Sequence, residues 1–238
     1  MLTLAFDTSS KTAAVALLRD SDILYDNIIN TGLKHSEVLL PEIDHALRAI
    51  SVKIKDVDLF ACTIGPGSFT GLRIGVSTLK GLMLATGKPA AGISSLAALA
   101  LNAGKTSKLI CSVMDAGRGQ VYAAFYRYDK NEYLEQLGVE KAVQPENILS
   151  TIDEEIDLIG DGAINYADII CKNKKTVINS KLPKYIKASS VGILGIKKFY
   201  RKDLLNAETF SQPENNCAFP LIAKNRITDS KMIFFLIT

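Results

Sequence analysis

The chain has 238 residues, of which 47% are hydrophobic and 22% are charged, and its formal net charge is +3. This length is enough for one large domain or for two lobes with separate cores, and the composition excludes a mainly disordered chain. The small net charge argues against a nucleic-acid surface, and we identify no arginine-rich or aromatic-interleaved basic run.

No apolar run reaches the roughly 18–20 residues that a membrane-spanning helix needs. The first residues resemble a strand that meets an acid, not a secretory signal. The cysteines are scattered without a Cys-x-x-Cys pair, which predicts free thiols in a reducing compartment and no disulfide or zinc site. These features predict a cytoplasmic protein without a membrane anchor. The cysteines are Cys62, Cys111, Cys171 and Cys217.

Apolar runs in the first 30 residues predict three strands joined by short polar turns. The predicted strands are 2–6, 12–18 and 23–29. The first of them ends in Asp7, which small hydroxyl residues follow. An apolar run over 109–114 ends in the same way at Asp115, and residues 121–128 again resemble a strand. Two hairpins in register, each with an acid at its turn, predict an internal duplication with a cleft between two lobes.

Helical patterns follow the first hairpin. An apolar stripe of helical spacing predicts a helix, and its members are Leu39, Leu40, Ile43, Leu47 and Ile50. Pro41 lies inside it and removes a backbone hydrogen bond to Glu37, which predicts a kink or a short break. The apolar run 58–64 predicts a strand, and a glycine-rich segment leads from it into a second helix over residues 68–86.

This glycine-rich segment, residues 65–75, reads GPGSFTGLRIG. A strand followed by a glycine-rich turn and a helix start can present free backbone N–H groups to an anion. It is neither a Walker loop nor a dinucleotide fingerprint, because the required spacings are absent. The alternative is that the glycines permit a tight turn and close packing. Gly71 and Gly75 would let another backbone approach, either a core element of the same chain or a partner helix.

The remaining elements follow in order, with a lobe boundary predicted at residues 102–105. The first lobe is expected to span 1–104 and to close with a strand over 89–93 and a helix over 94–101. The second lobe is expected to span 105–238. Its predicted elements are strands at 109–115, 121–128 and 133–143, a short helix from Pro145, a strand ending near Ile159, and helices after Gly162 and over 191–204.

Metal and nucleophilic sites are disfavoured by the residues available. His35 and His45, the two histidines, lie ten residues apart on one helix, which separates them by roughly 80° around its axis. Ser68 near a helix start would need a base beside it, and nothing in the sequence arranges one. The sequence therefore predicts no metal site and no complete nucleophilic constellation.

A nucleotide or anion site is better supported. The two acid-bearing turns could face each other across the cleft, with backbone N–H groups holding phosphates and an acid holding hydrated Mg²⁺. The alternative is that both are simply well-formed turns. The candidate nucleotide- or anion-binding residues are Asp7, Thr8, Ser9, Gly67, Ser68, Arg73, Asp115, Gly117 and Arg118.

Taken together, these features resemble the bacterial TsaB (YeaZ) proteins of tRNA threonylcarbamoyladenosine synthesis. The resemblance covers residues 1–128 well and the remainder weakly. GPGSFTGLRIG in this position is specific to that family, whereas the DTS turn is not. The matching segments are LAFDTS, HSEVLLPEIDHAL, GPGSFTGLRIGVSTLKGL, GISSLAALA and MDAGRGQVYAAFY.

The resemblance implies an α/β fold: the duplicated actin-like and sugar-kinase-like (ASKHA) two-lobe fold, with mixed sheets flanked by helices. It implies a non-catalytic scaffold that pairs with TsaD, which transfers the threonylcarbamoyl group to adenosine 37 of tRNA, and that works with the ATPase TsaE. It further implies a homodimer when the chain is alone, and contact with tRNA only through the complex. Both pairings would use helices 34–49 and 68–86. The implied interface residues are His35, Leu39, Ile43, Gly71, Leu72, Gly75, Thr78, Leu79 and Leu82.

The resemblance also bears on cofactors. ATP or ADP with Mg²⁺ at the interface of the complex is the one cofactor it suggests. TsaD-like proteins hold a metal with two histidines four apart, and Ser95 and Leu99 stand at those positions here, which favours a non-catalytic role. On this interpretation the glycine pair clears space for a partner, and Gly75→Leu is expected to block pairing with TsaD while leaving the fold largely intact.

Two rival functions stay open at this point. One is a self-sufficient actin-like ATPase or kinase that uses Asp7 and Asp115, and the other is a peptidase-like protein that uses Ser68. The C-terminal third also departs from the family, which usually carries a Pro-x-Tyr-Leu-Arg-like strand near its end. The nearest match is 220–224, and the chain closes with the apolar run 232–237, whose role the sequence leaves open.

Overall fold

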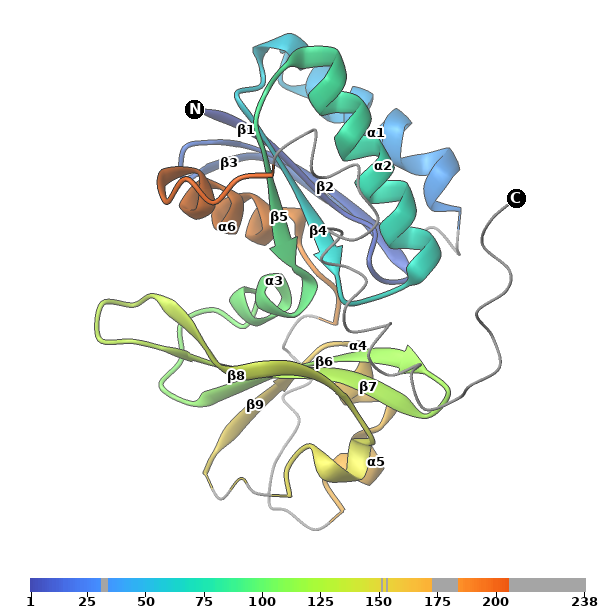
Figure 1. Cartoon of the computed structure of the whole chain (residues 1–238), viewed down its shortest axis with the longest axis vertical. Coiled ribbons are helices and arrows are strands. Elements are labelled where there is room, and N and C mark those ends of the chain that lie inside the picture. The colour runs from blue at the N-terminus through green and yellow to red at the C-terminus, as the bar shows by residue number, and fades with distance from the viewer. Residues whose placement is uncertain (31–33, 151, 153, 173–183, 206–238) are drawn as a thin grey trace.

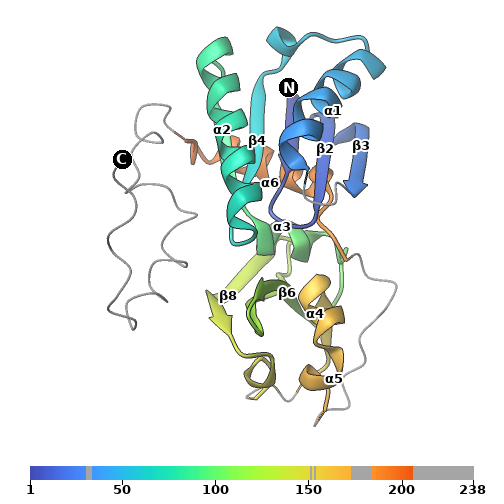
Figure 2. The ribbon, with the colours of Figure 1, turned by 90° about the vertical axis from the view of Figure 1, so that its right-hand side faces the viewer.

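The computed structural model describes residues 1–30, 34–150, 152, 154–172 and 184–205. Two lobes, each built on one β-sheet, are stacked along the long axis of the molecule (Figures 1 and 2). The predictions for Cys217, for the 220–224 segment and for the apolar run 232–237 lie outside the described residues.

The first lobe contains a five-stranded mixed sheet with the strand order β3-β2-β1-β4-β5. β1, β2 and β3 form an antiparallel meander, whereas β4 and β5 extend the sheet in parallel from β1. β1 is buried on both faces, so it appears in the sequence as an unbroken apolar run and not as an alternating one. The strands are β1 Leu2–Asp7, β2 Thr12–Arg19, β3 Asp22–Asn30, β4 Leu59–Gly65 and β5 Ala90–Ser94.

Helices cover both faces of this sheet. α1 (His35–Ala49) and α2 (Phe69–Thr86) pack on the face that carries the large side chains, such as Phe6 of β1. α6 (Ala188–Tyr200) packs on the opposite face, which is lined by alanines such as Ala5 (Figure 1). α1 continues through Pro41 without interruption, so the expected short break is absent.

The position of α6 corrects the predicted boundaries of the lobes. It was expected in the second lobe, but it lies against β1, β2, β4 and β5 of the first. The contact is close: a Cβ atom at Gly192 would lie 2.4 Å from Leu18 Cδ1, and one at Gly195 would lie 2.6 Å from Ala61 Cβ. Beyond α6, the Leu205 amide donates a hydrogen bond to the carbonyl of Ala90 on β5, at 2.8 Å. The first lobe is therefore assembled from two separate parts of the chain.

The second lobe repeats the first in reduced form. Its four-stranded sheet has the order β8-β7-β6-β9, in which β6, β7 and β8 form the antiparallel meander and β9 pairs in parallel with β6. Asp7 pairs with the second strand of its hairpin, and Asp115 does the same in its own hairpin, which confirms the predicted duplication. The strands are β6 Leu109–Gly117, β7 Gln120–Tyr128, β8 Leu134–Val143 and β9 Ile156–Ile159.

Short helices complete the structure. α3 (Ser95–Leu101) lies between the two lobes, where it contacts strands of both sheets (Figure 2). α4 (Asp161–Asn165) and α5 (Ala167–Ile170) follow β9 and pack on the second lobe. Two 3₁₀ turns, Ile54–Asp56 and Pro145–Asn147, precede β4 and follow β8.

Candidate functional site

The turn of the first hairpin holds a buried carboxylate. Asp7 Oδ1 accepts hydrogen bonds from the Ser9 amide at 3.1 Å, from Ser9 Oγ at 2.6 Å and from Thr63 Oγ1 at 2.6 Å. The other oxygen, Oδ2, has no partner among the described residues. Burial raises the pKa of this carboxyl despite those three donors. Asp7, Thr8 and Ser9 are each no more than 1% exposed, so these three residues at the start of the turn are closed to solvent.

The glycine-rich segment is what closes the turn. The Ser68 amide donates to the carbonyl of Ser9 at 2.7 Å, and Thr8 Oγ1 donates to the carbonyl of Gly71 at 2.7 Å. A Cβ atom at Gly67 would lie 2.3 Å from the Ser9 carbonyl oxygen, and one at Gly71 would lie 2.0 Å from that of Thr8. Only glycine allows the start of α2 to lie this close to the hairpin.

This arrangement bears on the predicted anion site. The amides of Ser9 and Ser68, which the prediction would aim at a phosphate, already donate within the protein. Arg73 does not reach the turn: its guanidinium carbon lies 3.9 Å from the centroid of the Phe69 ring, on the exposed side of α2. Nucleotide binding at these residues stays a prediction, and it would require the start of α2 to move away from the hairpin.

The matching turn of the second lobe is more open. Asp115 Oδ1 accepts from the Gly117 amide at 2.8 Å, and its Oδ2 accepts from Asn165 Nδ2 at 3.1 Å. Gly117 and the predicted site residue Arg118 are exposed. The two lobes thus differ in the exposure of their acids: Asp7 is fully buried, whereas Asp115 is partly exposed.

Asp161 is a residue of this second turn that the sequence analysis missed. Its Oδ1 accepts from the Asp115 amide at 3.1 Å, and burial together with the nearby charge of Asp115 raises its pKa. A Gly-x-Gly at 160–162 directly follows β9, and a Gly-x-Gly at 65–67 begins at the last residue of β4. This repeated spacing is the signal that could have identified it.

The predicted partner interface on α1 and α2 needs a correction. Most of its residues face the core of the lobe, and only Thr78 and Leu82 are partly exposed. A Cβ atom at Gly75 would lie 2.5 Å from Thr8 Oγ1 and 3.2 Å from Cys62 Sγ, so the glycine pair makes room for the lobe's own hairpin and β4. The prediction that Gly75→Leu leaves the fold intact is therefore wrong. The buried residues are His35, Leu39, Ile43, Gly71, Leu72, Gly75 and Leu79.

His35 illustrates this internal role. Its Nε2 lies 3.0 Å from the carbonyl oxygen of Ser10 and 3.3 Å from that of Thr12. A carbonyl oxygen can only accept, so Nε2 carries the hydrogen. His35 is 3% exposed, and it ties the start of α1 to the first hairpin.

A different row of residues forms the outer surface of these helices. Ser77, Gly81 and Ala85 recur every four residues on α2 and are all exposed. A Cβ atom at Gly81 would meet no atom within 4 Å. Leu84, which is 67% exposed, adds an apolar side chain on α2, and Leu40, which is 56% exposed, adds one on α1. We call Ser77, Gly81 and Ala85 the α2 small-residue row; it offers the close approach that the prediction had assigned to Gly71 and Gly75.

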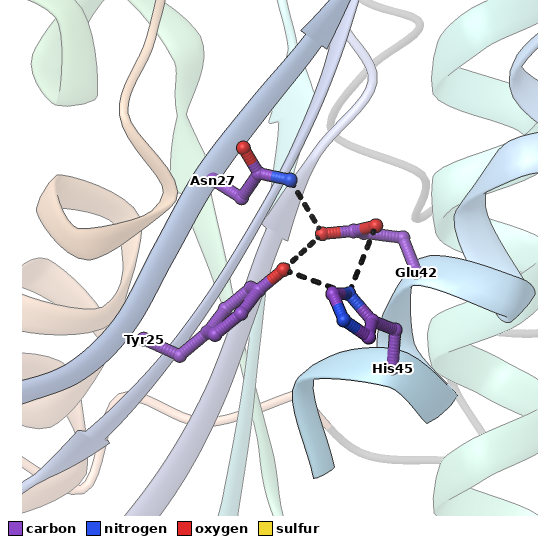
Figure 3. A network of polar contacts seen from close by, with 4 residues as sticks. All are labelled: Tyr25, Asn27, Glu42 and His45. Atoms are coloured by element: carbon purple, nitrogen blue, oxygen red, sulfur yellow. Dashed lines mark hydrogen bonds and ion pairs between the residues drawn. The ribbon is translucent and has the colours of Figure 1, made fainter. Parts of the chain in front are cut away.

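A polar network fixes α1 on the edge strand β3 (Figure 3). Glu42 Oε1 accepts from Tyr25 Oη at 2.5 Å and from Asn27 Nδ2 at 2.8 Å. Tyr25 Oη also lies 3.2 Å from His45 Nδ1, and burial and the Glu42 carboxylate raise the pKa of the tyrosine. The carboxylate is buried while His45 is exposed, so the network runs from the core of the lobe to its surface.

Comparison with known proteins identifies the family. The model of the family described as TsaD, tRNA N6-adenosine threonylcarbamoyltransferase, matches residues 30–219. The tRNA threonylcarbamoyladenosine biosynthesis protein TsaB of Bacillus subtilis is 36% identical over 155 residues, which are 65% of this chain and 67% of that protein. The chain belongs to the TsaB family. The Escherichia coli protein of the same name is 31% identical over 61% of this chain and 64% of its own length, so the matched segments span about two thirds of these relatives.

Solved structures agree with the family and the fold. YeaZ from Pseudomonas aeruginosa superposes with a TM-score of 0.75 at 27% identity, over 88% of this chain and 97% of that one. Component A of the (R)-2-hydroxyglutaryl-CoA dehydratase of Acidaminococcus fermentans, at 12% identity and a TM-score of 0.53, shares the fold alone, over 83% and 98% of the two chains. The chain has the duplicated actin-like and sugar-kinase-like two-lobe fold.

Two features are absent from the described part of the chain. It contains no group of three or more histidine, cysteine, aspartate or glutamate side chains placed to hold a metal ion. Across the same residues, no helix combines the length and the apolar character needed to cross a membrane.

Proposed function

We propose that this chain is a non-catalytic subunit of the machinery that makes threonylcarbamoyladenosine on tRNA, pairing with TsaD and working with TsaE. The observation that carries this proposal is membership of a family whose relatives are named tRNA threonylcarbamoyladenosine biosynthesis proteins. A relation to TsaD supports the pairing, because two related chains can share one mode of association. A tRNA N6-adenosine threonylcarbamoyltransferase of Geotalea uraniireducens is 34% identical over 112 residues, which are 40% of this chain and 33% of that protein.

The outer surface of α1 and α2 is the proposed pairing face. The α2 small-residue row allows a partner helix to approach closely, since side chains of this size leave the backbone accessible. Leu84 on α2 and Leu40 on α1 add exposed apolar side chains to these helices, and buried apolar area drives stable association. The same face would serve a homodimer when the chain is alone.

The positions where TsaD-like proteins carry metal-binding histidines support a non-catalytic role. Ser95 and Leu99, which stand where TsaD-like proteins place metal-binding histidines, are 0% and 1% exposed in the core between the lobes. Leu99 Cδ2 lies 2.6 Å from where a Cβ atom of Gly160 would be, so this position is filled by packing. Asp7, the acid on which an ATPase of this fold would depend, is sealed under α2.

A pull-down with purified TsaD and TsaE, with and without ATP, tests the proposal. Gly81→Leu adds a large side chain to the pairing face where the monomer has open space, so the variant should fold normally and lose TsaD. Gly81→Ala is the matched control, because it makes a similar helix change while keeping the surface small. Retention of TsaD by Gly81→Leu would rule out this face.

A separate measurement tests the non-catalytic role. The purified chain alone should show no ATP hydrolysis above that of an Asp7→Ala preparation. Hydrolysis that the Asp7 substitution abolishes would instead support a self-sufficient ATPase.

A further inference from the structure

The end of α6 carries a run of basic and aromatic residues that the sequence analysis overlooked. Residues 197–202 read Lys-Lys-Phe-Tyr-Arg-Lys. The last helical turn and the cap after it therefore place four cations close together, which we call the α6 cation cluster. Its members are Lys197, Lys198, Arg201 and Lys202.

Internal ion pairs account for little of this charge. Among the described residues, Lys198 is the member with an ion-pair partner, Asp203 at 2.8 Å. Lys197 and Arg201 lie one helical turn apart, and burial and the neighbouring guanidinium lower the pKa of Lys197. Cations at a helix C-terminus do offset the helix dipole, but that effect is confined to the last turn and needs only one or two charges. The cluster thus retains positive charge that an anion would stabilise.

Two tyrosines stand beside these cations. Tyr200 is 71% exposed, so a planar group has access to its ring, which makes a T-shaped contact with Phe199 at a centroid distance of 5.8 Å. Tyr133, which is 51% exposed, belongs to the turn between β7 and β8, where the Asp129 amide donates to its carbonyl at 2.9 Å. Lys197 Nζ lies 5.4 Å from the centroid of the Tyr133 ring, which joins the α6 end to the second lobe. Exposed aromatic rings next to cations are typical of sites that stack unpaired bases while binding phosphates.

We infer that the α6 cation cluster, with Tyr200 and Tyr133, is a direct contact surface for RNA on this chain. The cations would pair with backbone phosphates, and the exposed rings would stack on unpaired bases. Protein–protein interfaces are depleted in lysine, and three of the four cations here are lysines, so the composition of the cluster favours RNA over an acidic protein. The choice of tRNA as the RNA rests on the proposed function.

This surface is compatible with pairing through α1 and α2. α6 packs on one face of the first sheet through residues such as Ala5, whereas α1 and α2 pack on the opposite face through residues such as Phe6. Figure 1 shows the two groups of helices on opposite sides of that sheet. A partner on α1 and α2 would therefore leave the end of α6 accessible.

Fluorescence anisotropy of an end-labelled, unmodified tRNA transcript with the full-length chain tests the inference. Wild type should bind at low salt, with an affinity that falls as salt rises from about 50 to 200 mM. The double variant Lys197→Ala with Arg201→Ala should weaken binding about tenfold. It should also reduce the slope of log affinity against log salt concentration by about 1.4–1.8, which is the contribution of two phosphate contacts. Lys53→Ala with Lys55→Ala removes two exposed lysines, one that caps the 3₁₀ turn Ile54–Asp56 and one within it; this double variant is the matched control and should bind like wild type.

The stacking role has its own pair of variants. Tyr200→Ala should weaken binding by about fivefold to a hundredfold, whereas Tyr200→Phe keeps the aromatic face and should bind like wild type. Circular dichroism and urea midpoints confirm that each variant folds.

Three results would overturn the inference: no binding by wild type, equal loss in the Lys197/Arg201 and Lys53/Lys55 double variants, or polyglutamate of comparable charge competing as well as RNA. The last result would assign the surface to an acidic protein. Because Gly81→Leu should lose TsaD yet bind the transcript normally, failure of the pairing proposal and failure of the RNA contact are distinguishable.

Discussion

Gly75→Ala and Gly81→Ala add the same methyl group to the same helix in two different surroundings. In both, replacing glycine in a helix interior favours the helix by roughly 1 kcal/mol. At Gly81 nothing lies within 4 Å of the new Cβ atom, so α2 should keep this gain. At Gly75 the new atom would lie 2.5 Å from Thr8 Oγ1, a buried hydroxyl that donates to the Gly71 carbonyl.

The cost at Gly75 has two parts. Overpacking a filled site costs about 1–3 kcal/mol, and breaking the buried Thr8 hydrogen bond costs about 1–3 kcal/mol more. After subtraction of the helix gain, Gly75→Ala should lower the free energy of unfolding by about 1–5 kcal/mol, whereas Gly81→Ala should raise it by about 0.5–1 kcal/mol.

Urea unfolding followed by circular dichroism measures both values, and equal slopes against urea would show that the two variants expose similar surface on unfolding. Shifts of the same sign and size would refute the claim that α2 is pressed against the first hairpin at Gly75. The assay needs no partner protein, so it tests the packing independently of the proposed function.

Two further predictions concern buried carboxylates. Glu42→Ala removes the acceptor that Tyr25 and Asn27 share and should lower the free energy of unfolding by about 1–3 kcal/mol. Glu37→Ala, in an exposed pair with Lys34, should change that free energy by less than about 1 kcal/mol. A larger effect at Glu37 in urea unfolding would contradict this. Burial raises the pKa of Asp7, so the folded state binds this proton more tightly than the unfolded chain does. Its stabilising contribution is complete below the unfolded pKa of about 4 and is lost as the pH rises through the folded pKa. Asp7→Asn has no proton to lose, so its free energy of unfolding should not fall in this way. Urea unfolding at several pH values should show the free energy of unfolding of the variant rising relative to that of wild type from pH 4 toward 7. The opposite trend would contradict the buried state of Asp7.

Local patterns predicted most of the elements in this chain. The hairpins, the parallel strand before the glycine-rich segment, and both helices on the outer face of the first sheet follow from apolar runs and spacing, and the structure places them within a few residues of the prediction. The repeated acid at Asp7 and Asp115 was enough to predict the duplication, because a duplicated unit keeps its turn at the same distance from its strand.

Long-range contacts were the part that local patterns could not supply. The spacing of Gly71 and Gly75 showed that something lies close to α2, but it could not show whether that neighbour is the chain's own hairpin or a partner. The same limit applied to α6, because an apolar pattern does not name the sheet that it covers. Only the alanines of β1 and β4, matched to Gly192 and Gly195, indicate which sheet it covers.

The return of α6 to the first sheet sets the order in which this protein can be completed during synthesis. When residues 1–101 have left the ribosome, β1, β4 and β5 can pair, yet the alanine-lined face of their sheet has no cover until residues 188–200 emerge. Asp26 on β3 then holds the start of that helix by two hydrogen bonds. Its Oδ1 accepts from the Ser189 amide at 3.3 Å, and its Oδ2 accepts from Ser189 Oγ at 2.5 Å. A fragment that ends near residue 104 would display a bare apolar sheet to water and would aggregate, so the two lobes cannot be separated by a single cut.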